Sequence, residues 1–396
     1  MEEDMLNFRE PKEQLWALFE RKSKITIGLP RCLSSNARLF PMTPESVGML
    51  VEHGFRVLIE EKAAMPLRYP DTRYTHHGAE IVSRSEAFKA DIVIHLAPVT
   101  SIEVGLMRRN STLMTLRTPS GDDPAALAML TKLNITALAL NRVVDAHQQR
   151  PFHNILSEVD GYAAIVLGAA LLSDPAAGKG ILLGGALGVV PCEVLIIGGG
   201  IAGRTAARAA IGQGAIVRLF DTDTYRLRMT QIELDKRVIC SDLNPHVLTN
   251  AMRSADLVIA TDTQTPITID SSLVEVAKRG ALFFDLNSAR GDSFNSLPAI
   301  DACDGDAIRS AMLKEQRFCL TSPGARVART AAMTLSNALF ALLDSIKRVG
   351  DVSSLLHVHR GIRQGVYTYR GKVVDAELAN ATGAQRIDLE ILLSMS

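Results

Sequence analysis

The residues of this chain with the clearest chemical meaning are three glycines, Gly198, Gly200 and Gly203, in the stretch VLIIGGGIAGRTAARAA. They follow an apolar run typical of a strand and open an alanine-rich run typical of a helix. In that context the first glycine permits a tight turn, the second lets the backbone approach a pyrophosphate, and the third lets helix and strand pack closely. The phosphates would then rest on the helix N-terminus. The spacing therefore predicts a dinucleotide site.

A carboxylate in the next strand-like run makes this prediction more specific. The run AIVRLFD ends at Asp221, 18 residues after Gly203, where its oxygens would accept hydrogen bonds from the hydroxyls of an adenosine ribose. A carboxylate at that place repels a ribose 2′-phosphate, so we expect NAD rather than NADP as the cofactor. Arg226 lies close by and would meet a 2′-phosphate if its side chain turned inward, which keeps NADP as the alternative.

The elements that must position this site form two series of alternating strands and helices. From Ile25 onward, apolar runs such as DIVIHL and ITALAL alternate with helix-like segments. These runs lack polar alternation, as expected for parallel strands covered on both faces. After a helix expected over 157–173 and a glycine-rich stretch, the rhythm resumes from EVLIIGGG to ALFFDLN. The pattern predicts an α/β protein with two doubly wound, mostly parallel, Rossmann-like domains.

A long amphipathic helix expected over 327–349 returns the chain to the first domain, which is therefore predicted to be discontinuous. We expect residues 1–151 and 328–396 to form a substrate domain and residues 152–327 to form an NAD-binding domain. A crevice between two such sheets is where an open α/β protein holds a ligand. The site is predicted to lie there.

Charge and composition bear on the class of partner. Lys plus Arg and Asp plus Glu both number 43, so neither nucleic acid nor an anionic membrane is indicated and a small-molecule substrate is favoured. The N-terminal residues lack the apolar stretch of a secretory signal. An apolar stretch at 180–203 is interrupted by glycines and a proline, which argues against a membrane span. The five cysteines show no zinc spacing, so we expect idle thiols, no metal site and a cytoplasmic protein.

Over nearly its whole length, the chain resembles the family of alanine dehydrogenases and proton-translocating transhydrogenases. The resemblance rests on the order and spacing of several segments, which are IGLP at 27–30, TPESVGMLVEHGFRVLIE, SEVDGYAAIVLGAALL, GKGILLGGALGVVPCEVLIIGGGIAG and RVARTAAMTLSNALF. It implies an NAD-dependent oxidoreductase that reversibly deaminates alanine or a related amino acid to the 2-oxo acid. It also implies a homo-oligomer, a dimer or a hexamer.

Family positions that contact NAD are occupied in this chain. The resemblance adds Ser157, Arg226 and Ser241 to the glycines and to Asp221 as cofactor-binding residues. The cofactor half of the predicted site therefore keeps its chemistry.

Family positions on the substrate side are mostly replaced. Active members use an arginine for the substrate carboxylate, a lysine near the carbonyl, a histidine as acid–base group and an aspartate that positions water or ammonia. Arg38 is the expected carboxylate-binding residue, one position out of register, and His95 stands in place of the lysine. Thr118 and Ala289 stand where the histidine and the aspartate belong, and Ser322 replaces an asparagine.

Two functions stay open on this basis. In the first, the chain is an oxidoreductase that recruits Arg38 and His95. Activity on alanine is then expected to be weak or absent, because loss of a general acid–base group commonly costs roughly 10²–10⁴ in rate. In the second, it is a pseudoenzyme, an NAD-binding sensor or regulatory paralogue. If Arg117 and Arg290 both turn into the crevice, an anionic substrate unlike alanine is favoured, and if both face solvent the sensor is favoured.

Overall fold

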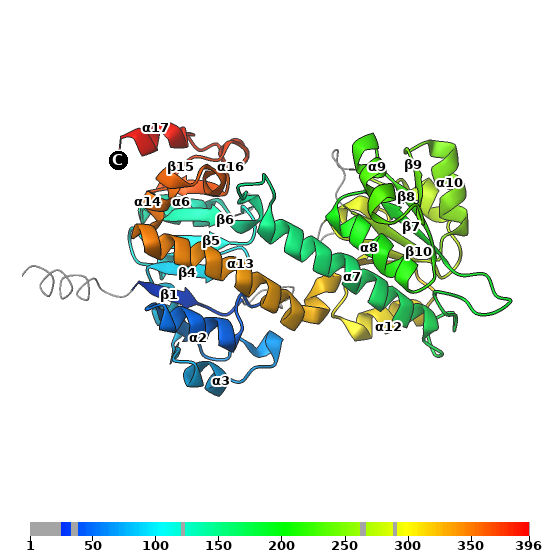
Figure 1. The fold of residues 1–396 in the computed structure, drawn as a ribbon, viewed down its shortest axis with the longest axis horizontal. Helices are drawn as coiled ribbons and strands as arrows, with labels where there is room; N and C mark the ends of the chain where they lie inside the picture. The colour runs from blue at the N-terminus through cyan, green and yellow to red at the C-terminus, as the bar shows by residue number, and fades with distance from the viewer. Residues whose placement is uncertain (1–24, 33–38, 120–122, 262–266, 288–290, 396) are drawn as a thin grey trace, which may run out of the picture.

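The computed structural model describes residues 25–32, 39–119, 123–261, 267–287 and 291–395. Within these ranges the chain forms two α/β bodies, each built on one sheet, and two long helices run between them (Figure 1). The predicted fold class, with two mostly parallel Rossmann-like sheets, is confirmed. Arg38, Ala289 and Arg290 fall outside the described residues.

The first sheet has eight strands in the order β15-β14-β6-β5-β4-β1-β2-β3. Strands β1 to β6 are parallel, β14 runs antiparallel to β6, and β15 runs antiparallel to β14. The order of the parallel strands reverses between β1 and β4, which is where open α/β sheets hold ligands. The strands are β1 (Thr26–Leu29), β2 (Arg56–Glu60), β3 (Glu80–Val82), β4 (Ile92–His95), β5 (Thr112–Thr115), β6 (Thr136–Ala139), β14 (Val366–Tyr369) and β15 (Lys372–Val373).

The second sheet has seven parallel strands in the order β12-β13-β11-β10-β7-β8-β9. Here the order reverses between β7 and β10. The two sheets therefore repeat one winding pattern. The strands are β7 (Glu193–Ile197), β8 (Ile216–Phe220), β9 (Ile239–Ser241), β10 (Leu257–Ala260), β11 (Leu282–Asp285), β12 (Ala299–Asp301) and β13 (Cys319–Thr321).

Shorter helices surround both sheets, and several begin where the sequence supplies a cap. Thr43 accepts a hydrogen bond from the Ser46 N–H at the start of α2, and Ser83 and Thr100 form capping boxes on α4 and α5. The helices of the first body are α2 (Pro44–Glu52), α3 (Asp71–His76), α4 (Arg84–Phe88), α5 (Ser101–Gly105), α6 (Pro124–Lys132), α14 (Val352–Val358), α15 (Arg360–Arg363), α16 (Ala376–Thr382) and α17 (Leu389–Ser394). Those of the second body are α8 (Ile201–Gly212), α9 (Thr224–Glu233), α10 (Pro245–Ser254), α11 (Ser271–Glu275) and α12 (Gly305–Leu313). Four 3₁₀ turns are described, η1 (Met65–Leu67), η2 (Leu140–Arg142), η3 (Asp292–Phe294) and η4 (Pro323–Val327).

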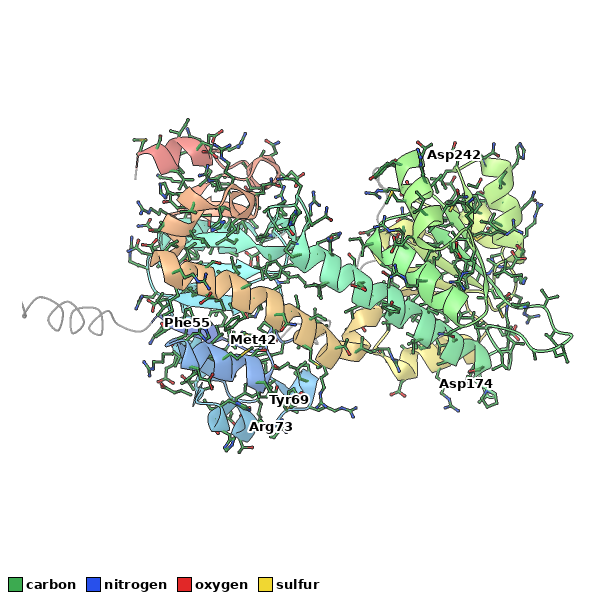
Figure 2. All side chains as sticks on the ribbon, viewed as in Figure 1. Met42, Phe55, Tyr69, Arg73, Asp174 and Asp242 are labelled. Atoms are coloured by element: carbon green, nitrogen blue, oxygen red, sulfur yellow. The ribbon has the colours of Figure 1, made fainter. Side chains whose placement is uncertain are left out.

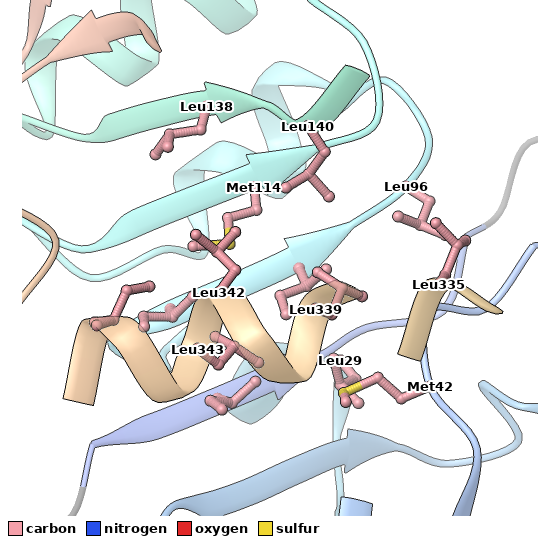
Figure 3. Close-up of a cluster of buried hydrophobic side chains, with 14 of the residues drawn as sticks. Leu29, Met42, Leu96, Met114, Leu138, Leu140, Leu335, Leu339, Leu342 and Leu343 are labelled. Atoms are coloured by element: carbon pink, nitrogen blue, oxygen red, sulfur yellow. The ribbon is translucent and has the colours of Figure 1, made fainter. Parts of the chain in front are cut away.

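Helix α13 (Ala328–Val349) lies on the first sheet although it follows the whole second body in sequence. Leucines on one side of the helix pack against side chains of β5 and β6 and their surroundings (Figure 3). Burial of each such leucine contributes roughly 1.5–3 kcal/mol relative to exposure. The labelled members of this cluster on the helix are Leu335, Leu339, Leu342 and Leu343. The C-terminal part of the chain therefore completes the core of the first body.

Helix α7 (Pro151–Ser173) connects the two bodies. Phe152 is buried in the core of the first body, while Ile165 and Leu172 are buried in the core of the second. The helix begins six residues before the expected Ser157, because Pro151 occupies its first turn, where no backbone donor is needed. By length and composition alone α7 is apolar enough to cross a membrane, which is weak evidence because core helices of globular proteins pass the same test. The 180–203 stretch instead forms turns, β7 and the start of α8.

Candidate functional site

The three glycines of the predicted dinucleotide site form the turn between β7 and α8. Gly198 has a φ of +115°, and Gly200 caps the N-terminus of α8. A Cβ atom on Gly203 would lie 1.9 Å from the Gly198 carbonyl oxygen, so the turn requires a residue without a side chain there. Thr261, after β10, donates a hydrogen bond of 2.9 Å to the same oxygen. The turn is thus fixed at the strand reversal of the second sheet, with the α8 N-terminus free of any side-chain cap.

Asp221 follows β8 and is fully buried beneath this turn, at 0% exposure. Its Oδ2 accepts a hydrogen bond of 2.6 Å from the Gly199 N–H, and its Oδ1 accepts one of 2.8 Å from the Asp223 N–H. The carboxylate therefore braces the glycine turn. Each of its oxygens retains a second lone pair for a ribose hydroxyl, but the carboxylate is fully buried, so a ribose can reach it only if the atoms that cover it move.

Arg226 is turned inward toward this carboxylate. Its Nη1 lies 3.8 Å from Asp221 Oδ2, and its Nε lies 3.8 Å from Asp223 Oδ2. Two carboxylates therefore already offset its charge. A dianionic 2′-phosphate would meet a surrounding of net negative charge, which favours a 2′-hydroxyl at this place.

The two predicted cofactor serines lie on β9 and on α7. Ser241 ends β9, and its carbonyl accepts a hydrogen bond of 3.3 Å from the Asp221 N–H. Ser157 lies on α7 one turn before Gly161, where a Cβ would come within 2.5 Å of the Ala202 carbonyl oxygen of α8. Helix α7 therefore packs closely against the first turn of α8. The three glycines form the β7–α8 turn, Asp221 and Arg226 lie beside it, Ser241 contacts Asp221, and Ser157 lies on the helix that packs against α8.

On the substrate side, His95 ends β4 and is 1% exposed. Its Nδ1 lies 2.9 Å from the Ala97 carbonyl oxygen, and its Nε2 has no hydrogen-bond partner among the residues that the structure describes. Arg38, predicted beside it, lies outside the described residues. Thr118, which the sequence analysis expects at the family's histidine position, is contacted by Arg142, which forms an ion pair with the buried Asp375. The Thr118 hydroxyl therefore takes part in a structural contact.

Asp160 is a titratable group that the sequence reasoning missed. It lies on α7 between the two cores, and its Oδ1 accepts a hydrogen bond of 2.8 Å from the Gly324 N–H of η4. Burial raises the pKa of this carboxyl to about 6, against the opposing effects of that hydrogen bond and of the positive charge of Arg117. A single acidic residue in the otherwise apolar run VDGYAAIVLGAALL was the available signal.

Arg117 reaches from the first body to the second. Its Nη1 donates to the Asn287 carbonyl oxygen at 3.4 Å, after β11. Asn287 in turn donates from its side chain to the Thr261 carbonyl oxygen at 3.0 Å. Arg117 thus connects the end of β5 with the end of β10, while Arg290 lies outside the described residues. Arg117, one of the two arginines whose direction bears on the choice between enzyme and sensor, therefore points between the bodies.

Among the described residues, no group of three or more His, Cys, Asp and Glu side chains is arranged to hold a metal ion.

Comparison with known proteins gives consistent matches along the chain. The family model described as "Alanine dehydrogenase/PNT, N-terminal domain" matches residues 28–159, and "Alanine dehydrogenase/PNT, C-terminal domain" matches residues 164–376. The alanine dehydrogenase of Methanococcus maripaludis is 29% identical over 361 residues, covering 90% of this chain and 96% of that protein. The Bacillus subtilis alanine dehydrogenase is 28% identical over 369 residues, covering 92% and 96%.

Solved structures agree with these matches. An L-alanine dehydrogenase superposes with a TM-score of 0.77 at 25% identity, covering 90% of this chain and 99% of that one. A transhydrogenase from Sinorhizobium meliloti superposes with a TM-score of 0.71 at 20% identity, covering 89% and 99%, which supports the fold alone.

Proposed function

Because the chain belongs to the alanine dehydrogenase/PNT family, we propose that it is an NAD(H)-dependent oxidoreductase of a small amino acid and its 2-oxo acid. The observation that carries the proposal is the β7–α8 glycine turn, braced by Asp221 and open at the α8 N-terminus. Bound NAD supplies hydride transfer, which no protein side chain provides. Gly198, Gly200 and Gly203 would hold the pyrophosphate, Asp221 and Arg226 the ribose end, and Ser157 and Ser241 the flanking contacts.

The substrate side favours a reaction other than ordinary alanine turnover. No acid–base group stands at Thr118, whereas His95 and Asp160 are titratable groups near the ends of the sheets. Arg117 carries a positive charge between the bodies and suits a carboxylate or a more strongly anionic substrate. Arg38 remains our candidate for the substrate carboxylate.

A second candidate function is an NAD-binding sensor or regulatory paralogue without turnover. The observation that favours it is the ion pair of Arg142 with Asp375, which engages Thr118 where the family places its acid–base group. In this case NAD binding would be retained while hydride transfer is lost.

Self-association is part of the proposal. The segment between α7 and β7 projects from the second body (Figure 1) and carries four exposed apolar residues, namely Leu182, Leu187, Val189 and Val190. A concentrated apolar surface of this kind usually marks a protein interface. We propose that it contacts another copy of the chain in a dimer or hexamer.

We also propose a cytoplasmic protein, divided into a substrate domain of residues 1–151 and 328–396 and an NAD-binding domain of residues 152–327.

Fluorescence titration of the purified protein with NADH and NADPH tests the cofactor assignment. Tighter binding of NADH is expected, and equal or tighter binding of NADPH would contradict the role given to Asp221 and Arg226.

A panel of amino acids and 2-oxo acids then separates the two functions. Turnover of any member supports the oxidoreductase, and binding without turnover supports the sensor. Alanine turnover on the order of 10 per second would contradict the expected loss of activity on alanine.

A further inference from the structure

The glycine turn between β7 and α8 contains three consecutive glycines, at 198–200. Glycine has no Cβ atom and reaches conformations that other residues avoid, so the two peptide groups within this run meet little steric resistance to rotation. A dinucleotide needs one fixed arrangement of them, because backbone N–H groups attract the pyrophosphate and carbonyl oxygens repel it. The turn therefore depends on other groups to hold its peptides.

The first of these peptides, between Gly198 and Gly199, is held on both sides. The Gly198 carbonyl oxygen accepts a hydrogen bond of 2.9 Å from Thr261 Oγ1, and the Gly199 N–H donates one of 2.6 Å to Asp221 Oδ2. Both side chains are buried. The orientation of this peptide is therefore fixed by residues that follow β8 and β10.

The second peptide, between Gly199 and Gly200, is held by an arginine of α8. Arg204 Nη1 donates a hydrogen bond of 3.3 Å to the Gly199 carbonyl oxygen. Arg204 is the fourth residue of α8, and helical side chains lean toward the N-terminus, which brings its guanidinium back over the first turn of the helix. A charged donor also makes a stronger hydrogen bond than a neutral one. The contact therefore restrains the peptide that leads into α8.

A carboxylate of α9 fixes the guanidinium of Arg204. Arg204 Nε lies 2.9 Å from Glu233 Oε2, and the arginine side chain is 24% exposed, so solvent screens this ion pair only in part. Arg208, one turn farther along α8, pairs with the other oxygen of the same carboxylate. Glu233 therefore holds two arginines, of which Arg204 is the one nearer to the glycine turn.

The restraint on the Gly199 carbonyl decides where the Gly200 N–H points. The peptide bond that joins them is trans, so its carbonyl and its N–H point in opposite directions. With the carbonyl turned toward Arg204, the N–H points away from the guanidinium. Within the part of the chain that the structure describes, no group accepts a hydrogen bond from this N–H. It is therefore held in one direction and is open to a ligand.

We propose that Arg204 is a positioning residue of the dinucleotide site, which holds the Gly199 carbonyl away from the phosphates and so aims the Gly200 N–H at the pyrophosphate of the cofactor. The inference rests on the proposed function, because it requires that the turn binds NAD(H). Without Arg204, the peptide samples orientations in which its carbonyl oxygen faces the phosphates and repels them. Binding of any ligand with a pyrophosphate is then weakened, and binding of the adenosine part is not.

Fluorescence titration of the full chain with NADH tests this role. Arg204→Met should bind NADH about 10-fold more weakly, because a hydrogen bond from a charged donor is lost. Arg208→Met is the matched control, because it removes the other arginine paired with Glu233, and it should change the affinity less than about 2-fold. In competition with NADH, ADP-ribose should show the same loss in Arg204→Met as NADH itself. Adenosine, which has no phosphate, should change less than about 2-fold.

Wild-type affinity for NADH in Arg204→Met would overturn the role of Arg204 and leave the cofactor assignment intact. Equal losses for adenosine and ADP-ribose would overturn the role as well, because they indicate general damage to the second body. If circular dichroism shows that Arg204→Met does not fold, Arg204→Lys decides, because one ammonium group replaces a guanidinium with two partners. A loss of NADH affinity of at least about 3-fold then supports the role, and an unchanged affinity overturns it. A wild-type chain that does not bind NADH would overturn the cofactor assignment and this role with it.

Discussion

Replacing Asp160 by asparagine should stabilise the protein at neutral pH and have no effect in acid. The asparagine side chain has the same shape and keeps an oxygen to accept the hydrogen bond from Gly324. It removes only the negative charge that burial disfavours. Because the change is nearly isosteric, its effect on stability reports the cost of that charge.

The expected magnitude follows from the pKa of Asp160, which rises from its ordinary value of 3.8 to about 6. One pKa unit corresponds to about 1.4 kcal/mol, so the ionised carboxylate destabilises the folded state by up to about 3 kcal/mol. A raised pKa in the folded state means that the stabilising effect of the proton is complete below pH 4 and is lost as the pH rises through about 6. At pH 8 the variant should exceed the wild type by up to about 3 kcal/mol, and below pH 4 the two should coincide.

Urea unfolding followed by far-ultraviolet circular dichroism, repeated from pH 4 to pH 8, measures this difference. Asp174→Asn is the matched control, because Asp174 follows the far end of the same helix (Figure 2). Hydrogen bonds from the Ala177 and Ala176 N–H groups lower the pKa of Asp174, so its variant should be less stable than the wild type at pH 8, the opposite sign. A stability difference for Asp160→Asn that does not change with pH would refute the reasoning.

Three further predictions concern the turn, the connection between the bodies and the first domain. Gly203→Ala should lose NADH binding at least about 10-fold in a fluorescence titration because its Cβ would collide with backbone at 1.9 Å, whereas Gly212→Ala, in open space on the same helix, should bind normally. Arg117→Gln should raise the pH midpoint of the change in stability caused by Asp160, because the positive charge of Arg117 lowers the pKa of that carboxyl. An unchanged midpoint would contradict this. Arg142→Met should lower the free energy of unfolding by on the order of 3 kcal/mol, since it leaves a buried carboxylate unpaired. Glu377→Gln, at an exposed partner of the same arginine, should change it by less than about 0.5 kcal/mol, and equal losses in the two variants would exclude the buried pair as the cause.

The parts of the fold that could be predicted are those that depend on local residue patterns in the sequence. Apolar runs such as DIVIHL fall on buried parallel strands because both faces of each sheet are covered, and the glycine spacing at 198–203 falls on a strand–turn–helix because each glycine meets a local steric demand. The orientation of the Asp221 side chain could not be predicted from the sequence. The sequence places it at the right strand end, but its burial under Gly199 depends on contacts between two turns.

Contacts among the substrate-side residues could not be predicted, because these residues are far apart in the sequence and come together only in the folded chain. Cys32 follows β1 and His95 ends β4, and no spacing in the sequence shows that β1 and β4 are neighbours at a reversal of strand order. Asp160 owes its raised pKa to the packing of α7 against η4, a contact between residues far apart in the chain. The family resemblance indicates His95, whereas neither Cys32 nor Asp160 stands at a position that it marks.

The crossing of α7 and α13 has a consequence for how such a protein can be taken apart. The chain leaves the first body along α7 and re-enters along α13, and the two helices pack against each other. The exit and return points are therefore neighbours, as in a domain inserted into a host at a single surface site. Excision of the inserted body should leave ends that a short linker can join. The first body would then fold as a contiguous chain, independently of the second.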